Sequence, residues 1–450
     1  MERYPTVAEV TDAARRLVAR FPATAVLRPV GTSRAGRPVL MLSVGHGPHH
    51  VLVVAGPHPD EPVGGASALA LAERVARGES LSAATDPALV TWDIILCLDP
   101  DGAALSEAGQ EGEAGEAGEA GEADSEGAPP APTPTLKSYY GTTYRPIAAE
   151  QPEWAPIVGH HLPESQALFD VIDDLRPVLQ CSLHSTDVGG TWVQLTGDLP
   201  GLAAPFEKSA ADLGIPLQHG TYDALYWENP SPAVYVLPPP DSTGRLAAGS
   251  ENIGRSTWCA PQRYGGVTAI VEVPLWAADP TEDLSPYPRP HQALRDLTEL
   301  VLTGGRQVTA VLDRARPFLP PAEENPLRRV VEWMSDGLYA LVAESWAPLA
   351  RQIASAPPTE HPLTTAHITA LNIVARRQPL RAAGLLLRLL KASDAPAAGP
   401  LHTELDDLFT TWCTDFERSL GLRPVPIPHQ VEHQTRTVLA CAESALKAAR

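Results

Sequence analysis

The chain has 450 residues, 44% of them hydrophobic, and its 34 basic and 54 acidic side chains give a formal net charge of −20. This length is long for a single hydrophobic core, so we expect two compact units. The acidic balance argues against nucleic acid or an anionic membrane as the main partner. The five cysteines are far apart and form no CxxC pair, which favours a reducing compartment over a disulfide framework.

The amino-terminal residues predict neither export nor membrane insertion. The opening "MERYPTVAEV" lacks the basic and apolar regions of a signal peptide, and no stretch approaches the roughly 20 apolar residues that span a bilayer. We therefore expect a soluble, cytoplasmic protein. The sequence indicates no particular oligomeric state.

The first part of the chain alternates between helical and strand patterns. Apolar side chains recur at helical spacing in residues 6–20, and short apolar runs bounded by turn residues predict strands. Gly78 is placed where it can end the second helix. The expected order is a helix, three strands, a helix and a strand, at residues 6–20, 25–31, 37–45, 49–56, 64–78 and 90–100.

Residues 107–135 have low sequence complexity. They contain the repeat "GEAGEAGEAGEA" followed by "GAPPAPTPT", and no large apolar residue lies between Leu105 and Leu136. Without apolar surface to bury, such a segment cannot offset its ordering entropy. We therefore predict a disordered acidic insertion.

The alternation of helices and strands resumes after this insertion. Residues 163–177 predict a helix, residues 178–185 a buried strand, and residues 266–276 the most apolar strand of the second half. Together these patterns predict an α/β domain with a mixed central sheet flanked by helices, over residues 1–305. Residues 306–450 are rich in Ala, Leu and Arg and predict an all-helical carboxyl-terminal unit.

Three of the predicted strands deliver polar side chains. "VLVVAGPHPDE" delivers His58 and Glu61, "LQCSLHS" delivers His184, and "VTAIVEV" places Glu272 in an apolar segment. Ligand sites of open α/β sheets lie at strand ends. Catalytic zinc takes three protein ligands and keeps one position open for water, and His58, Glu61 and His184 would supply that set for one ion per chain. Glu272 would then stand near it as a general base.

Each of these residues also has an ordinary structural interpretation. His58 and Glu61 could form a turn that opens a helix. His184 could be a hydrogen-bonded core histidine, and Glu272 could face solvent on an edge strand. Their joint occurrence at successive strand ends favours the metal site.

The sequence resembles the zinc carboxypeptidase family over roughly residues 1–300. "GPHPDE", "CSLHS" and "AIVEV" stand in the order of the family's HxxE pair, its third ligand histidine and its catalytic glutamate. "VGTSRAGRP", "LDPDG" and "LPESQALFDVIDDLRP" resemble the family's early hairpin, its Asn-Pro-Asp-Gly turn and the acidic helix before the third ligand. The resemblance implies a hydrolase of amide bonds with zinc on His58, Glu61 and His184. It also implies Glu272 as the base.

The resemblance further implies an arginine that neutralises the oxyanion or binds the terminal carboxylate of the substrate. Arg145 in "TTYRP" matches the family's Asn-Arg pair, with Tyr144 in place of the asparagine. The acidic insertion occupies the stretch where another family arginine stands, so Arg255 and Arg263 are further candidates for substrate binding. Guanidinium groups suit this role because they bind carboxylates through two parallel hydrogen bonds.

Three functions are compatible with these patterns. The first is an intracellular zinc carboxypeptidase acting on small peptides, and the second is a deacylase of N-acyl amino acids with the same fold. The third is a metal-binding scaffold without catalytic activity, whose helical unit binds a partner. The presence of Glu272 argues against the third.

Overall fold

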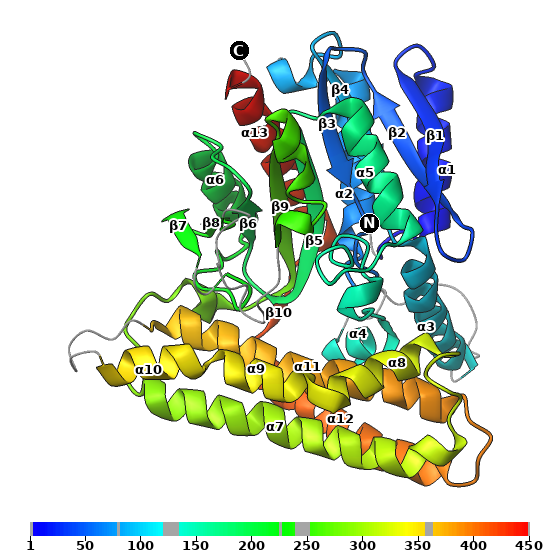
Figure 1. Cartoon of the computed structure of the whole chain (residues 1–450), viewed down its shortest axis with the longest axis vertical. Helices are drawn as coiled ribbons and strands as arrows, with labels where there is room; N and C mark the ends of the chain where they lie inside the picture. The colour runs from blue at the N-terminus through cyan, green and yellow to red at the C-terminus, as the bar shows by residue number, and fades with distance from the viewer. Residues whose placement is uncertain are drawn as a thin grey trace, which may run out of the picture.

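The computed structural model describes residues 3–78, 82–119, 135–224, 227–238, 253–355 and 363–448 (Figure 1). Within these ranges a mixed sheet is flanked by helices, and further helices gather at one end of the molecule (Figure 1). This confirms the predicted fold class. None of the helices in these ranges is long and apolar enough to cross a lipid bilayer.

The sheet has the strand order β1-β2-β4-β3-β5-β9-β6-β8-β7, and β10 pairs with β9 outside this path. The central pairs β4–β3, β3–β5 and β5–β9 are parallel, whereas β1–β2, β2–β4 and β9–β6 are antiparallel. The strands of the described residues are β1 Ala25–Thr32, β2 Pro38–Val44, β3 His49–Val54, β4 Val90–Ile95, β5 Leu179–Gly189, β6 Trp192–Leu195, β7 Glu228–Ser231, β8 Val234–Val236, β9 Val267–Ala277 and β10 Arg423–Pro424.

The α-helices cover both faces of the sheet and form the separate group at its end. In the described residues they are α1 Val7–Arg20, α2 Val63–Arg77, α3 Pro100–Glu119, α4 Leu136–Thr142, α5 Pro163–Leu175, α6 Ala203–Leu213, α7 Pro290–Ala315, α8 Pro326–Trp333, α9 Tyr339–Ser345, α10 Ala347–Ser355, α11 Thr365–Lys391, α12 Ala398–Leu420 and α13 Ile427–Ala448. Two of the early ends follow from local sequence. The Thr6 side chain caps α1, and Gly78 ends α2 in a left-handed conformation at φ +62°.

Alternation along β3 explains the two layers of core. Val51 and Val53 pack on the side of α1, α2 and α13, whereas Leu52 and Val54 pack on the side of α5. Successive side chains of a strand point to opposite faces, so a strand that is apolar at every position is buried on both.

Helices α7 to α12 extend the core beyond the sheet (Figure 1). The central helix α11 contacts α7, α8 and α12, and it also touches α4 near the site described below. The predicted boundary between residues 305 and 306 falls inside α7. After α12 the chain returns to the sheet, where β10 pairs with β9 and α13 packs on α2, α6 and β9. The division into two units stays a prediction.

The acidic segment differs from the prediction of disorder. Residues 107–119 continue helix α3, so the prediction is wrong for them, while residues 120–134 lie outside the described ranges. The helix begins in a buried turn in which the Asp99 carboxylate accepts a hydrogen bond from the Gly102 amide. Alanine and glutamate are strong helix formers, and Glu107 accepts a hydrogen bond of 2.7 Å from the Val7 amide. A helix already started can therefore continue without large apolar side chains.

Candidate metal centre and active site

The loop after β3 brings His58 and Glu61 to one side of the molecule. Gly56 adopts φ +57°, a left-handed conformation that lets the chain turn directly after the strand, and α2 starts two residues after Glu61. His184 lies on β5, next to β3 in the sheet. The three residues therefore meet because parallel strands deliver their carboxyl ends to one edge.

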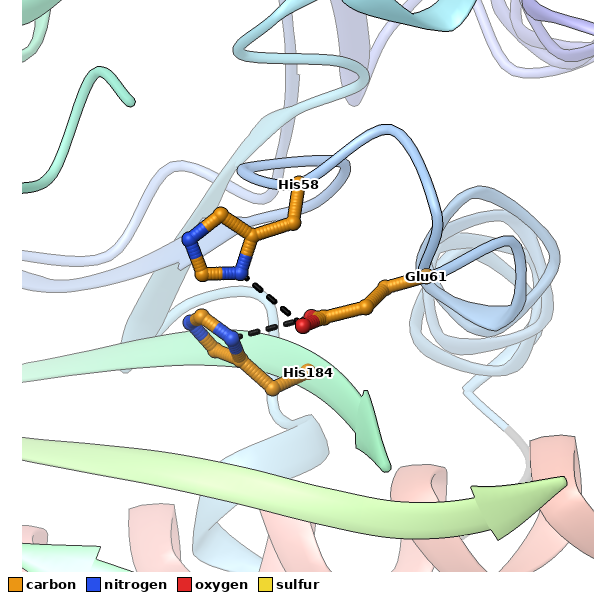
Figure 2. A group of neighbouring side chains, drawn as sticks. All are labelled: His58, Glu61 and His184. Carbon is orange, nitrogen blue, oxygen red and sulfur yellow. Dashed lines mark hydrogen bonds and ion pairs between the residues drawn. The ribbon is translucent and has the colours of Figure 1, made fainter. Parts of the chain in front are cut away.

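The three side chains converge on one point, as Figure 2 shows. His58 Nδ1 lies 2.9 Å from Glu61 Oε1, and His184 Nδ1 lies 3.0 Å from Glu61 Oε2. One candidate ligand atom from each residue lies within 4.8 Å of the others. All three residues are buried. Two imidazole nitrogens and a carboxylate form a donor set that fits catalytic zinc.

Glu153 orients His184 from the opposite side. It is fully buried, and its Oε2 lies 3.0 Å from His184 Nε2, while its Oε1 accepts a hydrogen bond of 2.8 Å from Ser182 Oγ. A carboxylate on the second nitrogen of a ligand histidine fixes the ring and its tautomer. Glu153 could not be identified from the sequence, because it lies in an irregular segment before α5 with no pattern that indicates burial.

The buried charges favour a cation at this position. Burial would lower the pKa of His184, but the carboxylates of Glu61 and Glu153 raise it well above its usual value. Burial would raise the pKa of Glu61, but the neighbouring imidazoles of His58 and His184 hold it well below its usual range. Burial and the charge of Arg145 instead lower the pKa of His58, so the positive charge is favoured at His184, between the carboxylates of Glu61 and Glu153.

Glu272 stands on the strand beside the ligand strand. β5 and β9 pair in parallel with His184 opposite Glu272, so the candidate base and the third candidate ligand are direct neighbours across the ladder. Burial, reinforced by the Glu61 carboxylate, raises the pKa of Glu272 to about 8. A carboxylate with a raised pKa is a better proton acceptor, which suits a general base.

Arg145 lies directly against the candidate ligands. Its Nη1 donates hydrogen bonds to Glu61 Oε1 at 2.6 Å and to Asp60 Oδ1 at 3.1 Å. The guanidinium therefore stands beside the point on which the ligand atoms converge. Asp60, the third residue of the "HPDE" motif, holds it there.

Comparison with known families agrees with this geometry. Residues 10–190 match the zinc carboxypeptidase family. The match includes His58, Glu61 and His184, whereas Glu272 lies beyond it. It confirms the resemblance predicted from the sequence and supports the zinc metallopeptidase class. No curated protein matches the chain in sequence.

Solved metallocarboxypeptidase structures are also similar to this chain. A metallo-carboxypeptidase from Burkholderia cenocepacia aligns with 59% of this chain and 58% of its own, at 16% identity and a TM-score of 0.35. Carboxypeptidase A from Helicoverpa armigera aligns with 61% of this chain and 65% of its own, at 16% identity and a TM-score of 0.35. The chain thus spans less than two-thirds of the length of either structure.

Helix α11 adds two arginines to the candidate zinc carboxypeptidase site. Arg377 forms an ion pair with Asp187 and donates a hydrogen bond of 3.1 Å to Thr186 Oγ1. Arg381 Nη2 lies 3.0 Å from Asp60 Oδ2. The Nε atom of Arg377 is buried and has no hydrogen-bond partner among the described residues. The spacing of four in "ARRQPLR" places both arginines on one helix face. Such pairs usually face solvent, so the sequence gives no sign that they reach the site.

A cavity of about 160 Å³ connects these groups. It lies between the carboxyl ends of β5 and β9 and helix α11. The charged side chains that line it are Glu61, Arg145, Asp187, Asp223, Glu272, Arg377 and Arg381. The catalytic candidates therefore share one polar space with the arginines of α11.

The other two arginines predicted for substrate binding lie elsewhere. Arg263 forms an ion pair with Asp173 of α5, at 3.2 Å, and its guanidinium carbon lies 5.9 Å from the ring centre of Tyr264. Arg255 is exposed on a short 3₁₀ turn. The structure brings neither of them to the cavity with Glu272.

A second cavity, of about 470 Å³, adjoins His58 and Glu61 from another direction. Most of its lining is apolar or aromatic, including Val10, Tyr139 and Trp276. Cavities of this size and character are typical of small-molecule sites. The candidate metal site is therefore bordered by one polar and one apolar cavity.

Proposed function

We propose that the chain is a zinc-dependent carboxypeptidase acting on small peptides. The observation that carries this proposal is the cavity in which Glu61, Glu272 and three arginines meet beside a buried pair of histidines. Zinc held by His58, Glu61 and His184 would polarise the scissile carbonyl and lower the pKa of a water molecule. The remaining chemistry belongs to side chains of this chain.

Glu272 acts as the base in this proposal. Its carboxylate removes a proton from the attacking water and then delivers it to the leaving amine. A cation on the neighbouring ligands would lower the raised pKa of Glu272, since an opposite charge favours the ionised form. The base would thus be ionised at neutral pH when the site is loaded.

Arg145 stabilises the negative charge that develops on the scissile carbonyl oxygen. Its position against Glu61 supports this assignment, because a donor beside the ligand set can reach an oxygen that is polarised there. This leaves the terminal carboxylate of the substrate to other cations. Arg377 and Arg381, on the opposite wall of the cavity, supply them.

The test is a comparison of peptides with free and amidated carboxyl termini on zinc-loaded protein. We expect kcat/KM to fall about 10- to 100-fold on amidation, since a hydrogen bond to a charged group contributes about 1.5–3 kcal/mol. Arg377→Met should abolish most of this preference. The matched control is Arg376→Met, because Arg376 bonds to Asn372 within α11 and faces Phe416 of α12.

Three results would count against the proposal. Protein purified without chelator that holds no zinc contradicts a zinc enzyme. Equal hydrolysis of free and amidated peptides contradicts a carboxypeptidase. Retained zinc without turnover of any substrate favours a scaffold instead.

The apolar cavity favours a second candidate, a deacylase of N-acyl amino acids. In this alternative the acyl group occupies the cavity with Trp276, and the carboxylate of the amino acid binds Arg377. Turnover of long-chain N-acyl amino acids at a higher kcat/KM than dipeptides would support it. The cytoplasmic location and the absence of a nucleic-acid partner stay predictions.

A further inference from the structure

Helix α13 buries an unusually polar face against the sheet. Gln430, His433, Gln434, Thr435 and Thr437 are each at most 1% exposed. A helix that packs on a sheet normally buries apolar side chains, and buried polar groups are hydrogen-bonded. Thr435 Oγ1 and Gln434 Oε1 have no hydrogen-bond partner among the described residues, and the partners of the other polar atoms show what this face contacts.

The Gln434 side chain links the two strands that carry the reactive residues. Its amide nitrogen donates to the carbonyl oxygen of His184 at 2.8 Å and to that of Val271 at 3.1 Å. His184 is a candidate zinc ligand on β5, and Val271 directly precedes Glu272 on β9. The Gln434 side chain thus connects the backbones of β5 and β9 next to His184 and Glu272.

His433 reaches Glu272 through Thr191. The Thr191 hydroxyl donates to the carbonyl oxygen of Glu272 at 2.7 Å and lies 2.8 Å from His433 Nε2. Because the hydroxyl has one proton, it must accept from Nε2–H. His433 Nδ1 then accepts from Ser209 Oγ, at 2.9 Å, so the network selects one neutral tautomer.

Other polar side chains of α13 bond away from the site. Gln430 donates to the Val425 carbonyl, Thr437 to the carbonyl of the preceding helical turn, and Ser444 to the Pro200 carbonyl at 2.9 Å. These contacts satisfy buried groups without touching β5 or β9. Gln434 bonds directly to β5 and β9, and His433 reaches β9 through Thr191, so these two side chains connect α13 to the strands that carry the site.

We infer that His433 and Gln434 are positioning residues that hold β9 against β5 and so set the place of Glu272 relative to the zinc ligands. The inference rests on the proposed function. Errors of about 1 Å in such a placement can lower a rate about 100-fold, because the reacting groups must meet in a narrow geometry. The ladder sets which residues of β5 and β9 face each other, but the twist of the strands still affects where the Glu272 side chain lies relative to the ligands.

The test compares full-length Gln434→Leu with the control Ser444→Ala. Gln434→Leu removes two side-chain bonds from α13 to backbone and Ser444→Ala removes one, but only the bonds of Gln434 reach β5 and β9. For Gln434→Leu we expect kcat to fall about 10- to 100-fold with KM within about 3-fold, and zinc affinity, measured by competition with a chromophoric chelator, to fall by a similar factor. Ser444→Ala should lower the melting temperature while leaving kcat and zinc affinity within about 2-fold.

A second pair of variants keeps the inference testable if Gln434→Leu does not fold. His433→Leu removes the donor to Thr191, whereas His433→Gln retains an N–H donor there. We therefore expect a higher kcat in His433→Gln than in His433→Leu. Equal kcat in this pair, or equal zinc affinity in Gln434→Leu and Ser444→Ala, would overturn the inference. Wild-type protein that binds no zinc would instead refute the proposed function. If the wild type binds zinc without turnover, the zinc affinities of Gln434→Leu and Ser444→Ala decide the inference.

Discussion

The buried imidazole of His433 makes the stability of the protein depend on pH in a way that one substitution can isolate. The residue is 0% exposed, and burial lowers its pKa to about 3, from a usual value of about 6.5 in the unfolded chain. The folded state therefore excludes a proton that the unfolded state binds. Its contribution to stability is complete above about pH 6.5 and is lost as the pH falls below that value.

Between pH 7.5 and pH 5, the size of this stability change depends only on the pKa of His433 in the unfolded chain. A pH of 5 lies about 1.5 units below the pKa of the unfolded imidazole, and each unit is worth about 1.36 kcal/mol. The free energy of unfolding therefore falls by about 2 kcal/mol between pH 7.5 and pH 5. His433→Gln keeps an N–H donor for Thr191 but does not titrate. The pH-dependent part of the loss should therefore disappear in this variant.

The assay is urea-induced unfolding of both proteins at pH 7.5 and pH 5, followed by tryptophan fluorescence. Other titrating groups contribute equally to both proteins and cancel in the difference. We expect the gap in unfolding free energy between wild type and His433→Gln to change by about 2 kcal/mol between the two pH values. A gap that stays the same at both would refute the reasoning, because it would mean that His433 titrates normally in the folded protein.

Three further outcomes are expected. Glu272→Gln should lower kcat about 10²- to 10⁴-fold with zinc content unchanged, and joint loss of zinc would contradict its role as base. Glu153→Gln should weaken zinc binding about 10- to 100-fold in a chelator competition, and unchanged affinity would contradict its orienting role. Gly384→Ala should destabilise the fold by about 1–3 kcal/mol, because its added carbon would lie 1.9 Å from the Tyr140 carbonyl oxygen. Gly399→Ala, with open space at that position, is the matched thermal-melting control.

The sequence was sufficient for features that depend on local pattern. The apolar run at residues 51–54 predicts a strand, and β3 lies in the centre of the sheet. His58, Glu61 and His184 could be grouped because each follows or ends a predicted strand, and parallel strands end at one edge. Their convergence in space is therefore a consequence of the sheet.

Residues that act through tertiary contacts could not be found in this way. Arg377 lies 190 residues after Asp187, and only the packing of α11 against the strand ends brings the two together. Glu153 has no neighbour in sequence that indicates burial, and it becomes a partner of His184 only once β5 is in place. The polar residues of α13 carry no signal of burial in the sequence, and only the packing of the helix on the sheet buries them.

The path of the chain after β9 affects how the protein can be shortened or fused. Helices α7 to α12 lie in the sequence between β9 and α13, and both of these elements belong to the sheet layer. The helices are therefore a long insertion within the sheet domain and not a domain added after it. A truncation after residue 305 would remove Gln434 together with them. Joining the end of β9 directly to β10 would keep α13 but would remove Arg377 and Arg381 of α11, so any shortened version that binds substrate has to keep α11 as well.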